Sequence, residues 1–120
     1  MSELRLRLDS FDGFFRRVRK DARRIDAGDV SALAPSVSFA SADHLFATLT
    51  PNRWVLLGRL RQLGPSSIRA LAKSLDRDYR GVHSDVTALL EVGLIERDAD
   101  RKVLVPWSRI TAELLLDESA

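Results

Sequence analysis

The stretch SIRALAKSLDRDYRGVHSDVTALL, residues 67–90, decides the fold of this chain. Apolar residues recur at helical spacing on both sides of a short break at residues 76–78, which predicts two helices joined by a tight turn. The first helix starts at Ser66 or Ser67 and the second at Asp78, where short polar side chains cap free backbone N–H groups. The second helix opens with poor helix formers, and Gly81 alone costs about 1 kcal/mol relative to alanine. Such residues on a leading turn indicate a binding surface.

The flanking segments complete the pattern. Thr50 and Pro51 predict the start of an earlier helix, which ends at Gly64. Downstream, Gly93 ends the second helix of the pair, and residues 94–105 alternate like a β-hairpin. The residues that we expect to be buried in the three helices are Trp54, Leu57, Leu60, Leu63, Ile68, Leu71, Ala72, Leu75, Val82, Val86, Leu89 and Leu90. Helix, turn, helix and hairpin together make a winged helix-turn-helix.

The N-terminal part has a different pattern. Leucine and arginine alternate over residues 4–8, which predicts a half-buried strand. Residues 11–25 carry an apolar stripe at helical spacing, which predicts an amphipathic helix. Val37 and Phe39 share one face of a second, short strand, and residues 42–49 predict a helix of one or two turns.

These patterns define two domains in an α+β fold that is mainly α. Residues 1–49 form a strand–helix–strand extension, and residues 50–120 form the winged helix-turn-helix domain. Within the second domain, residues 110–114 alternate apolar and polar side chains. This alternation predicts a last strand, with a short helix as the alternative.

Composition excludes several classes of function. The chain has 120 residues, of which 45% are hydrophobic and 30% charged, as expected for a folded domain. The absence of cysteine excludes disulfides, thiolate catalysis and zinc fingers. No apolar run reaches the roughly 18 residues of a membrane span. The first ten residues lack the apolar core of a signal peptide, so we expect a cytoplasmic protein.

The distribution of charge favours a polyanionic partner. The whole chain carries only +2, from 19 basic and 17 acidic residues. Residues 51–90, however, hold seven basic residues against three acidic ones, a balance of +4. A basic stretch on a nearly neutral chain suits a nucleic-acid-binding face, although many such stretches are simply solvated.

In a winged helix-turn-helix the second helix of the pair enters the DNA major groove. Arg80 can bind the O6 and N7 atoms of guanine with two hydrogen bonds. Tyrosine and serine can bind phosphates or bases, and glycine lets the helix backbone approach DNA closely. The residues that we expect to contact DNA are Arg77, Tyr79, Arg80, Gly81, His83 and Ser84 on this helix, Ser67 and Arg69 on the preceding one, and Arg101 and Lys102 in the hairpin.

Three segments, SIRALAKSL, YRGVHSDVTALLEVGLIERD and RKVLVP, together resemble the MarR-like winged-helix transcriptional regulators. The longer frame, with an SFAS strand, LTPNR and VPW, is similar to a short antitoxin-like group from bacterial toxin–antitoxin operons. That resemblance implies a homodimer that represses its own promoter and captures a protein toxin through its N-terminal part. Gly81 stands where such proteins usually carry a polar residue, so the resemblance implies one DNA contact fewer at this position.

Other functions remain open or are disfavoured by the sequence. The runner-up is a winged-helix module that binds protein and not DNA. His83, Ser84 and Asp85 are successive residues of one helix and point in different directions, so they cannot form a catalytic triad. His44 is the other histidine, and no cluster has metal-ligand spacing. We expect no enzymatic activity, no cofactor, no metal and no membrane partner.

The N-terminal apolar residues are candidates for a contact surface. Three phenylalanines within five residues are a large apolar surface for a small extension, and a proline-containing linker separates them from the winged domain. A homodimer or partner interface is therefore favoured over packing within one chain. The residues concerned are Leu4, Leu6, Leu8, Phe11, Phe14, Phe15 and Val18.

Overall fold

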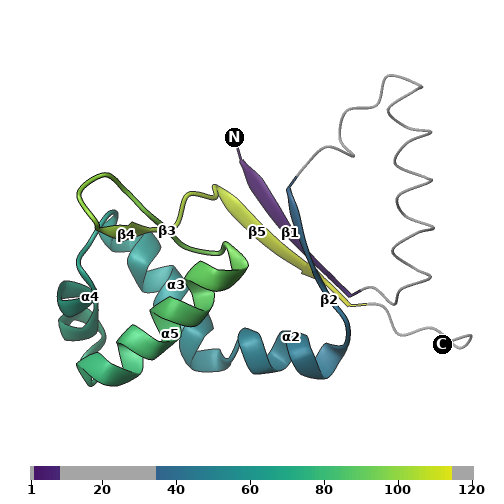
Figure 1. The fold of residues 1–120 in the computed structure, drawn as a ribbon, viewed down its shortest axis with the longest axis horizontal. Coiled ribbons are helices and arrows are strands. Elements are labelled where there is room, and N and C mark those ends of the chain that lie inside the picture. The colour runs from purple at the N-terminus through teal and green to yellow at the C-terminus, as the bar shows by residue number, and fades with distance from the viewer. Residues whose placement is uncertain (1, 9–34, 115–120) are drawn as a thin grey trace, which may run out of the picture. The chain divides into compact units, whose positions relative to one another are not determined.

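The computed structural model of the chain describes residues 2–8 and 35–114. Figure 1 shows the order of the elements, β1, β2, α2, α3, α4, α5, β3, β4 and β5. The chain divides into two compact units, the sheet unit (residues 1–46 and 109–120) and the helical unit (residues 47–108). The described part is α+β and mainly helical, which confirms the predicted class.

The sheet unit contains a three-stranded sheet in the order β2-β1-β5. The central strand β1 (Glu3–Leu8) pairs in parallel with β2 (Ser36–Phe39) and with β5 (Arg109–Glu113). Both strands that alternation predicted in the N-terminal part are present. The first connection of this parallel sheet runs through residues 9–34, which lie outside the described residues.

One face of this sheet is apolar because the three strands are in register. Leu6 of β1 stands opposite Val37 of β2 and Ala112 of β5. Leu4, Leu6 and Phe39 are all buried on this face. Alternate residues of a strand point to opposite faces, so the charged residues of β1 lie on the other side.

β5 departs from the predicted organisation. The sequence grouped residues 110–114 with the winged domain, and the strand does form. It pairs with β1 at the opposite end of the chain, where the hydroxyl of Thr111 lies 3.3 Å from Oε1 of Glu3. Alternation shows that one face of a strand is buried, but it does not identify the partner strand, and parallel partners are distant in sequence.

A short helix, α2 (Ala42–Thr48), follows β2. The backbone N–H of His44 donates to Oγ of Ser41 at 3.2 Å, so this serine caps the helix. Leu45 is buried, and the ring of Phe39 meets His44 edge-on with 5.1 Å between centroids.

The helical unit contains α3 (Pro51–Leu63), α4 (Ile68–Leu75) and α5 (Tyr79–Val92). The side chains of Thr50, Ser67 and Asp78 accept backbone N–H groups, so each helix begins at a predicted cap. Of the two serines that the sequence offers for α4, Ser67 is the cap. α5 ends at Gly93, whose φ of 84° is a left-handed conformation that glycine adopts readily.

The three helices enclose the core of the helical unit. The fully or almost fully buried residues are Leu56, Leu57, Leu60, Ile68, Leu71, Ala72, Val82, Val86, Leu89, Leu94, Ile95 and Val103. The predicted burial of Trp54 and Leu63 is wrong, since they are 54% and 46% exposed. The inward face of α3 instead includes Arg53, which binds Asp85 of α5. Trp54 lies outside this inward face and is therefore exposed to solvent.

A two-stranded antiparallel hairpin, β3 (Glu96–Arg97) and β4 (Val103–Leu104), follows α5 as predicted. The backbones of Ser66 and Val103 exchange two hydrogen bonds, of 3.0 and 2.8 Å. Because Ser66 immediately precedes the cap of α4, these bonds join the hairpin to the start of the α4–α5 pair.

Candidate nucleic-acid interface

The turn between α4 and α5 sets the direction of the second helix. Asp76 adopts the left-handed conformation (φ 52°, ψ 47°), and its N–H donates to the carbonyls of Ala72 and Lys73 in the last turn of α4. The N–H of Arg77 then donates to the carbonyl of Ala72 at 3.0 Å. Oδ2 of Asp78 accepts the N–H of Gly81 at 3.2 Å and starts α5. Local hydrogen bonds therefore define all three residues of the turn.

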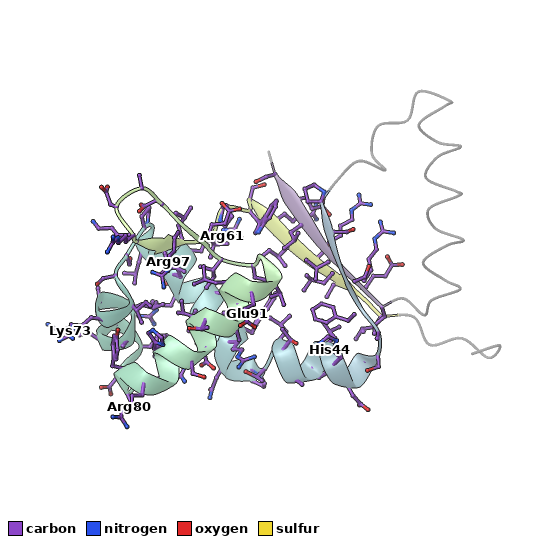
Figure 2. The ribbon with its side chains drawn as sticks, viewed as in Figure 1. His44, Arg61, Lys73, Arg80, Glu91 and Arg97 are labelled. Carbon is purple, nitrogen blue, oxygen red and sulfur yellow. The ribbon has the colours of Figure 1, made fainter. Side chains whose placement is uncertain are left out.

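The first turns of α5 have one buried and one exposed side. Val82 and Val86 are 0% exposed and face the core. The polar residues on the other side, which the sequence predicts as DNA contacts, are exposed, and they are Tyr79, Arg80, His83 and Ser84. Figure 2 shows Arg80 extending outward from the start of α5, and Lys73 outward from α4.

Aromatic and basic side chains connect the two helices at this surface. The guanidinium carbon of Arg69, on α4, lies 5.5 Å from the ring centroid of Tyr79, on α5, within the range of a cation–π contact. The rings of Tyr79 and His83 follow at 5.8 Å. The structure therefore brings Arg69 together with the predicted residues of α5. Ser67 is exposed beside them, and its Oγ accepts the N–H of Ala70.

Arg77 does not join this exposed surface. Its Nη2 donates to Oδ2 of Asp85 at 2.9 Å, and its side chain is 28% exposed. Oδ1 of the same carboxylate accepts Nε of Arg53 at 3.1 Å. Gly81 is half-buried beneath Arg77, so that a Cβ at this position would lie 3.4 Å from Nη2.

The hairpin places its predicted residues, Arg101 and Lys102, on the surface. Its turn is closed by Oδ1 of Asp98, which accepts the backbone N–H groups of Asp100 and Lys102 at 2.9 and 3.0 Å. These bonds direct one of the two nearby carboxylates into the turn. Arg97 is a third exposed cation in the hairpin, and its Nη1 donates to the carbonyl of Arg101.

The structure revises the argument from the basic stretch. Four of its seven basic residues bind acceptors within the helical unit. Arg53 and Arg77 bind Asp85, Arg59 binds the carbonyl and hydroxyl of Ser74, and Arg61 binds the carbonyls of Trp107 and Ser108. The remaining three, Arg69, Lys73 and Arg80, are exposed on α4 and α5. Lys73 of α4 and Arg97 of the hairpin are exposed cations that the sequence did not single out as DNA contacts.

The predicted interface residues fall into two groups. Leu4 and Leu6 are buried within the single chain, and Leu8 is half-buried. Phe11, Phe14, Phe15 and Val18 lie outside the described residues. Within residues 2–8 and 35–114, no three His, Cys, Asp or Glu side chains are grouped to hold a metal ion. No helix in the same ranges has the length and apolarity needed to cross a bilayer.

Comparison with protein families gives a match over the helical unit and most of β5. A model of the HVO_A0114 family covers residues 48–112, more than half of the chain. The chain belongs to the HVO_A0114 family. No curated protein and no solved structure matches it.

The HVO_A0114 match begins at the last residue of α2 and ends within β5. It therefore contains the whole α4–α5 pair, the hairpin and the three side chains of the Arg53–Asp85–Arg77 cluster. β1, β2 and residues 9–34 lie outside the HVO_A0114 match.

Proposed function

We propose that the helical unit is a winged helix-turn-helix that binds double-stranded DNA, with α5 as its recognition helix and the β3–β4 hairpin as its wing. The two-sided start of α5 carries this proposal. One side is completely buried, whereas the other presents tyrosine, arginine, histidine and serine at the end of the helix that would meet base edges.

Arg80 supplies the base-specific contact in this proposal. Its guanidinium is exposed on the leading turn and can donate two hydrogen bonds to guanine, worth about 1–3 kcal/mol of discrimination. Tyr79, held beneath the guanidinium of Arg69, presents an aromatic edge and a hydroxyl to the same groove. His83 and Ser84, one turn later, offer further donors and acceptors.

Phosphate contacts come from the elements on either side of α5. Arg69 and Lys73 are the exposed cations of α4, and Arg101 and Lys102 are those of the wing tip. Such contacts hold the protein in register on the duplex without reading sequence. The hydrogen bonds between Ser66 and Val103 hold the wing against the start of α4.

The proposed cellular role is the one that the resemblance to the short antitoxin-like group implies. The protein acts as a homodimer that represses its own promoter, with one recognition helix for each half-site, and the two half-sites about one helical turn apart. It is the antitoxin of a two-gene operon and neutralises a protein toxin through its N-terminal part. Co-expression with the neighbouring gene product and co-purification test the second role separately from DNA binding.

A band-shift titration tests DNA binding directly. The full-length protein is titrated against its own promoter and against a scrambled duplex of equal length, at 50 and 200 mM salt. We expect a clear preference for the promoter. Arg80→Ala and Tyr79→Ala should abolish that preference with the fold intact, and Arg80 should account for about 1–3 kcal/mol at one base pair.

Arg80→Lys is the matched control. Lysine keeps the charge but loses the planar fork that binds guanine at two points. We expect this variant to keep the salt dependence of the wild type and to lose selectivity. Equal affinity of the wild type for promoter and scrambled DNA would instead favour a protein-binding winged helix.

A further inference from the structure

A cluster of three charged side chains lies behind the exposed side of α5. Asp85 is its centre, with a side chain that is only 14% exposed. Each carboxylate oxygen accepts one arginine: Oδ1 binds Nε of Arg53 at 3.1 Å, and Oδ2 binds Nη2 of Arg77 at 2.9 Å. The two arginine side chains are 18% and 28% exposed, so water screens these contacts less than it screens surface ion pairs.

The cluster joins segments that are far apart in the sequence. Arg53 belongs to the first turn of α3, and its Nη1 also donates to the carbonyl of Thr48 at 2.8 Å. Arg77 belongs to the turn between α4 and α5, where its N–H is bonded to Ala72. Asp85 lies in the middle of α5. The carboxylate therefore connects the start of α3 and the α4–α5 turn to the recognition helix.

Arg77 runs along the surface of α5. It precedes the helix and reaches Asp85 eight residues later, so its guanidinium passes over the first turns of α5. A Cβ at Gly81 would lie 3.4 Å from Nη2, an ordinary van der Waals contact, so the guanidinium of Arg77 lies close to the helix at Gly81.

Nη1 of Arg77 is also withdrawn from solvent. It is buried and has no hydrogen-bond partner among the described residues. A guanidinium with one nitrogen bound to a carboxylate and another buried has few donors left for a phosphate. Arg80, three residues later, is fully on the exposed side. Arg77 and Arg80 therefore differ in their surroundings: Arg77 binds Asp85 within the protein, whereas Arg80 faces solvent.

We propose that Arg77 is a positioning residue and not a DNA contact: through Asp85, and with Arg53, it fixes the first turn of α5 in the orientation that presents Arg80. This inference rests on the proposed DNA binding. It predicts that Arg77 and Asp85 act as one unit in DNA recognition.

The salt dependence of operator binding separates positioning from contact. Removal of a phosphate contact reduces the slope of log K against log salt by about 0.9. We expect Arg77→Ala and Asp85→Ala each to lower operator affinity about tenfold with an unchanged slope, a typical size for coupling within one salt-bridge network. Lys73→Ala, which removes a proposed phosphate contact of α4, is the matched contact variant, and its slope should fall by about 0.9.

The double variant tests whether the two residues act together. If Arg77 acts through Asp85, Arg77→Ala/Asp85→Ala should again lose about tenfold, whereas independent effects would give about a hundredfold loss. A slope reduced by about 0.9 in Arg77→Ala, an additive double variant, or full operator affinity in both single variants overturns the proposal. Arg77→Lys, which keeps the charge, should restore part of the lost affinity and provides a folded comparison.

Amide hydrogen exchange tests the positioning role of Arg77 without DNA. In Arg77→Ala we expect faster exchange at residues 81–83 and unchanged exchange at Leu89, deep in the same helix. If the wild type binds no DNA, the proposed function fails, and exchange alone decides the positioning role. Unchanged exchange at residues 81–83 would then overturn that role as well.

Discussion

The tip of the hairpin offers the sharpest test of how DNA is approached. Arg101 and Lys102 are exposed there, and the carboxylate of Asp98 in the same turn accepts two backbone N–H groups. Arg101 has a φ of 63°, a left-handed conformation that costs alanine about as much as arginine. Arg101→Ala therefore removes the charge and leaves the backbone cost of the turn nearly unchanged.

The expected effect follows from counterion release. Each lost phosphate contact reduces the salt slope by about 0.9. A fourfold change in salt concentration therefore changes the affinity that the variant loses by about 3.5-fold. Arg101→Ala and Lys102→Ala should therefore lose about 3.5 times more affinity at 50 mM salt than at 200 mM. The loss should be the same for promoter and scrambled DNA, because a phosphate contact carries no sequence information.

Fluorescence anisotropy with labelled duplexes at four salt concentrations measures these slopes. Asp100→Asn is the control of opposite sign: it removes an exposed negative charge next to Arg101 and should raise affinity at low salt. A wild-type slope in both alanine variants would show that the hairpin does not reach the phosphates, and the wing assignment would be refuted.

Two further predictions concern stability and assembly. Leu60→Ala, at a position with no exposure, should lower the free energy of unfolding by about 2–5 kcal/mol, whereas Trp54→Ala, at an exposed position, should cost much less, as measured by urea denaturation. A fragment of residues 47–108 should stay folded, because it has its own core, but bind the operator far more weakly as a monomer. Polar replacement of Phe14 and Phe15 in the full chain should mimic that deletion, and sedimentation showing a dimer in both cases would contradict it.

Local signals predicted the helices of this protein well. Caps at Thr50, Ser67 and Asp78, and the stop at Gly93, depend on hydrogen bonds within a few residues, so the sequence contains all the information they require. The position of the hairpin followed in the same way. The buried side of α3 was partly misjudged, since an ion pair with Asp85 places an arginine inward where hydrophobicity alone would not.

Contacts between distant segments could not be predicted from local patterns. The pairing of β5 with β1 is one example, because alternation does not specify a partner strand. The role of Arg77 is another. Arg77 precedes α5, so helical spacing assigns it to no face of that helix. Its partner Asp85 lies eight residues later, and the other arginine that binds Asp85, Arg53, comes from α3. The sequence identified the exposed residues of α5, but it did not identify Arg77 as the residue proposed to position them.

The wild-type salt slope tests whether this surface accounts for all of the DNA binding. The exposed cations of α4, α5 and the hairpin are Arg69, Lys73, Arg80, Arg97, Arg101 and Lys102. If all six met phosphates, the slope would be about −5 for each protomer, and a contact to a base edge or repulsion by nearby acids makes it smaller. We therefore expect a dimer slope between about −5 and −10. A steeper slope would require further cations, and residues 16–24, with six basic side chains, would then be the segment to replace.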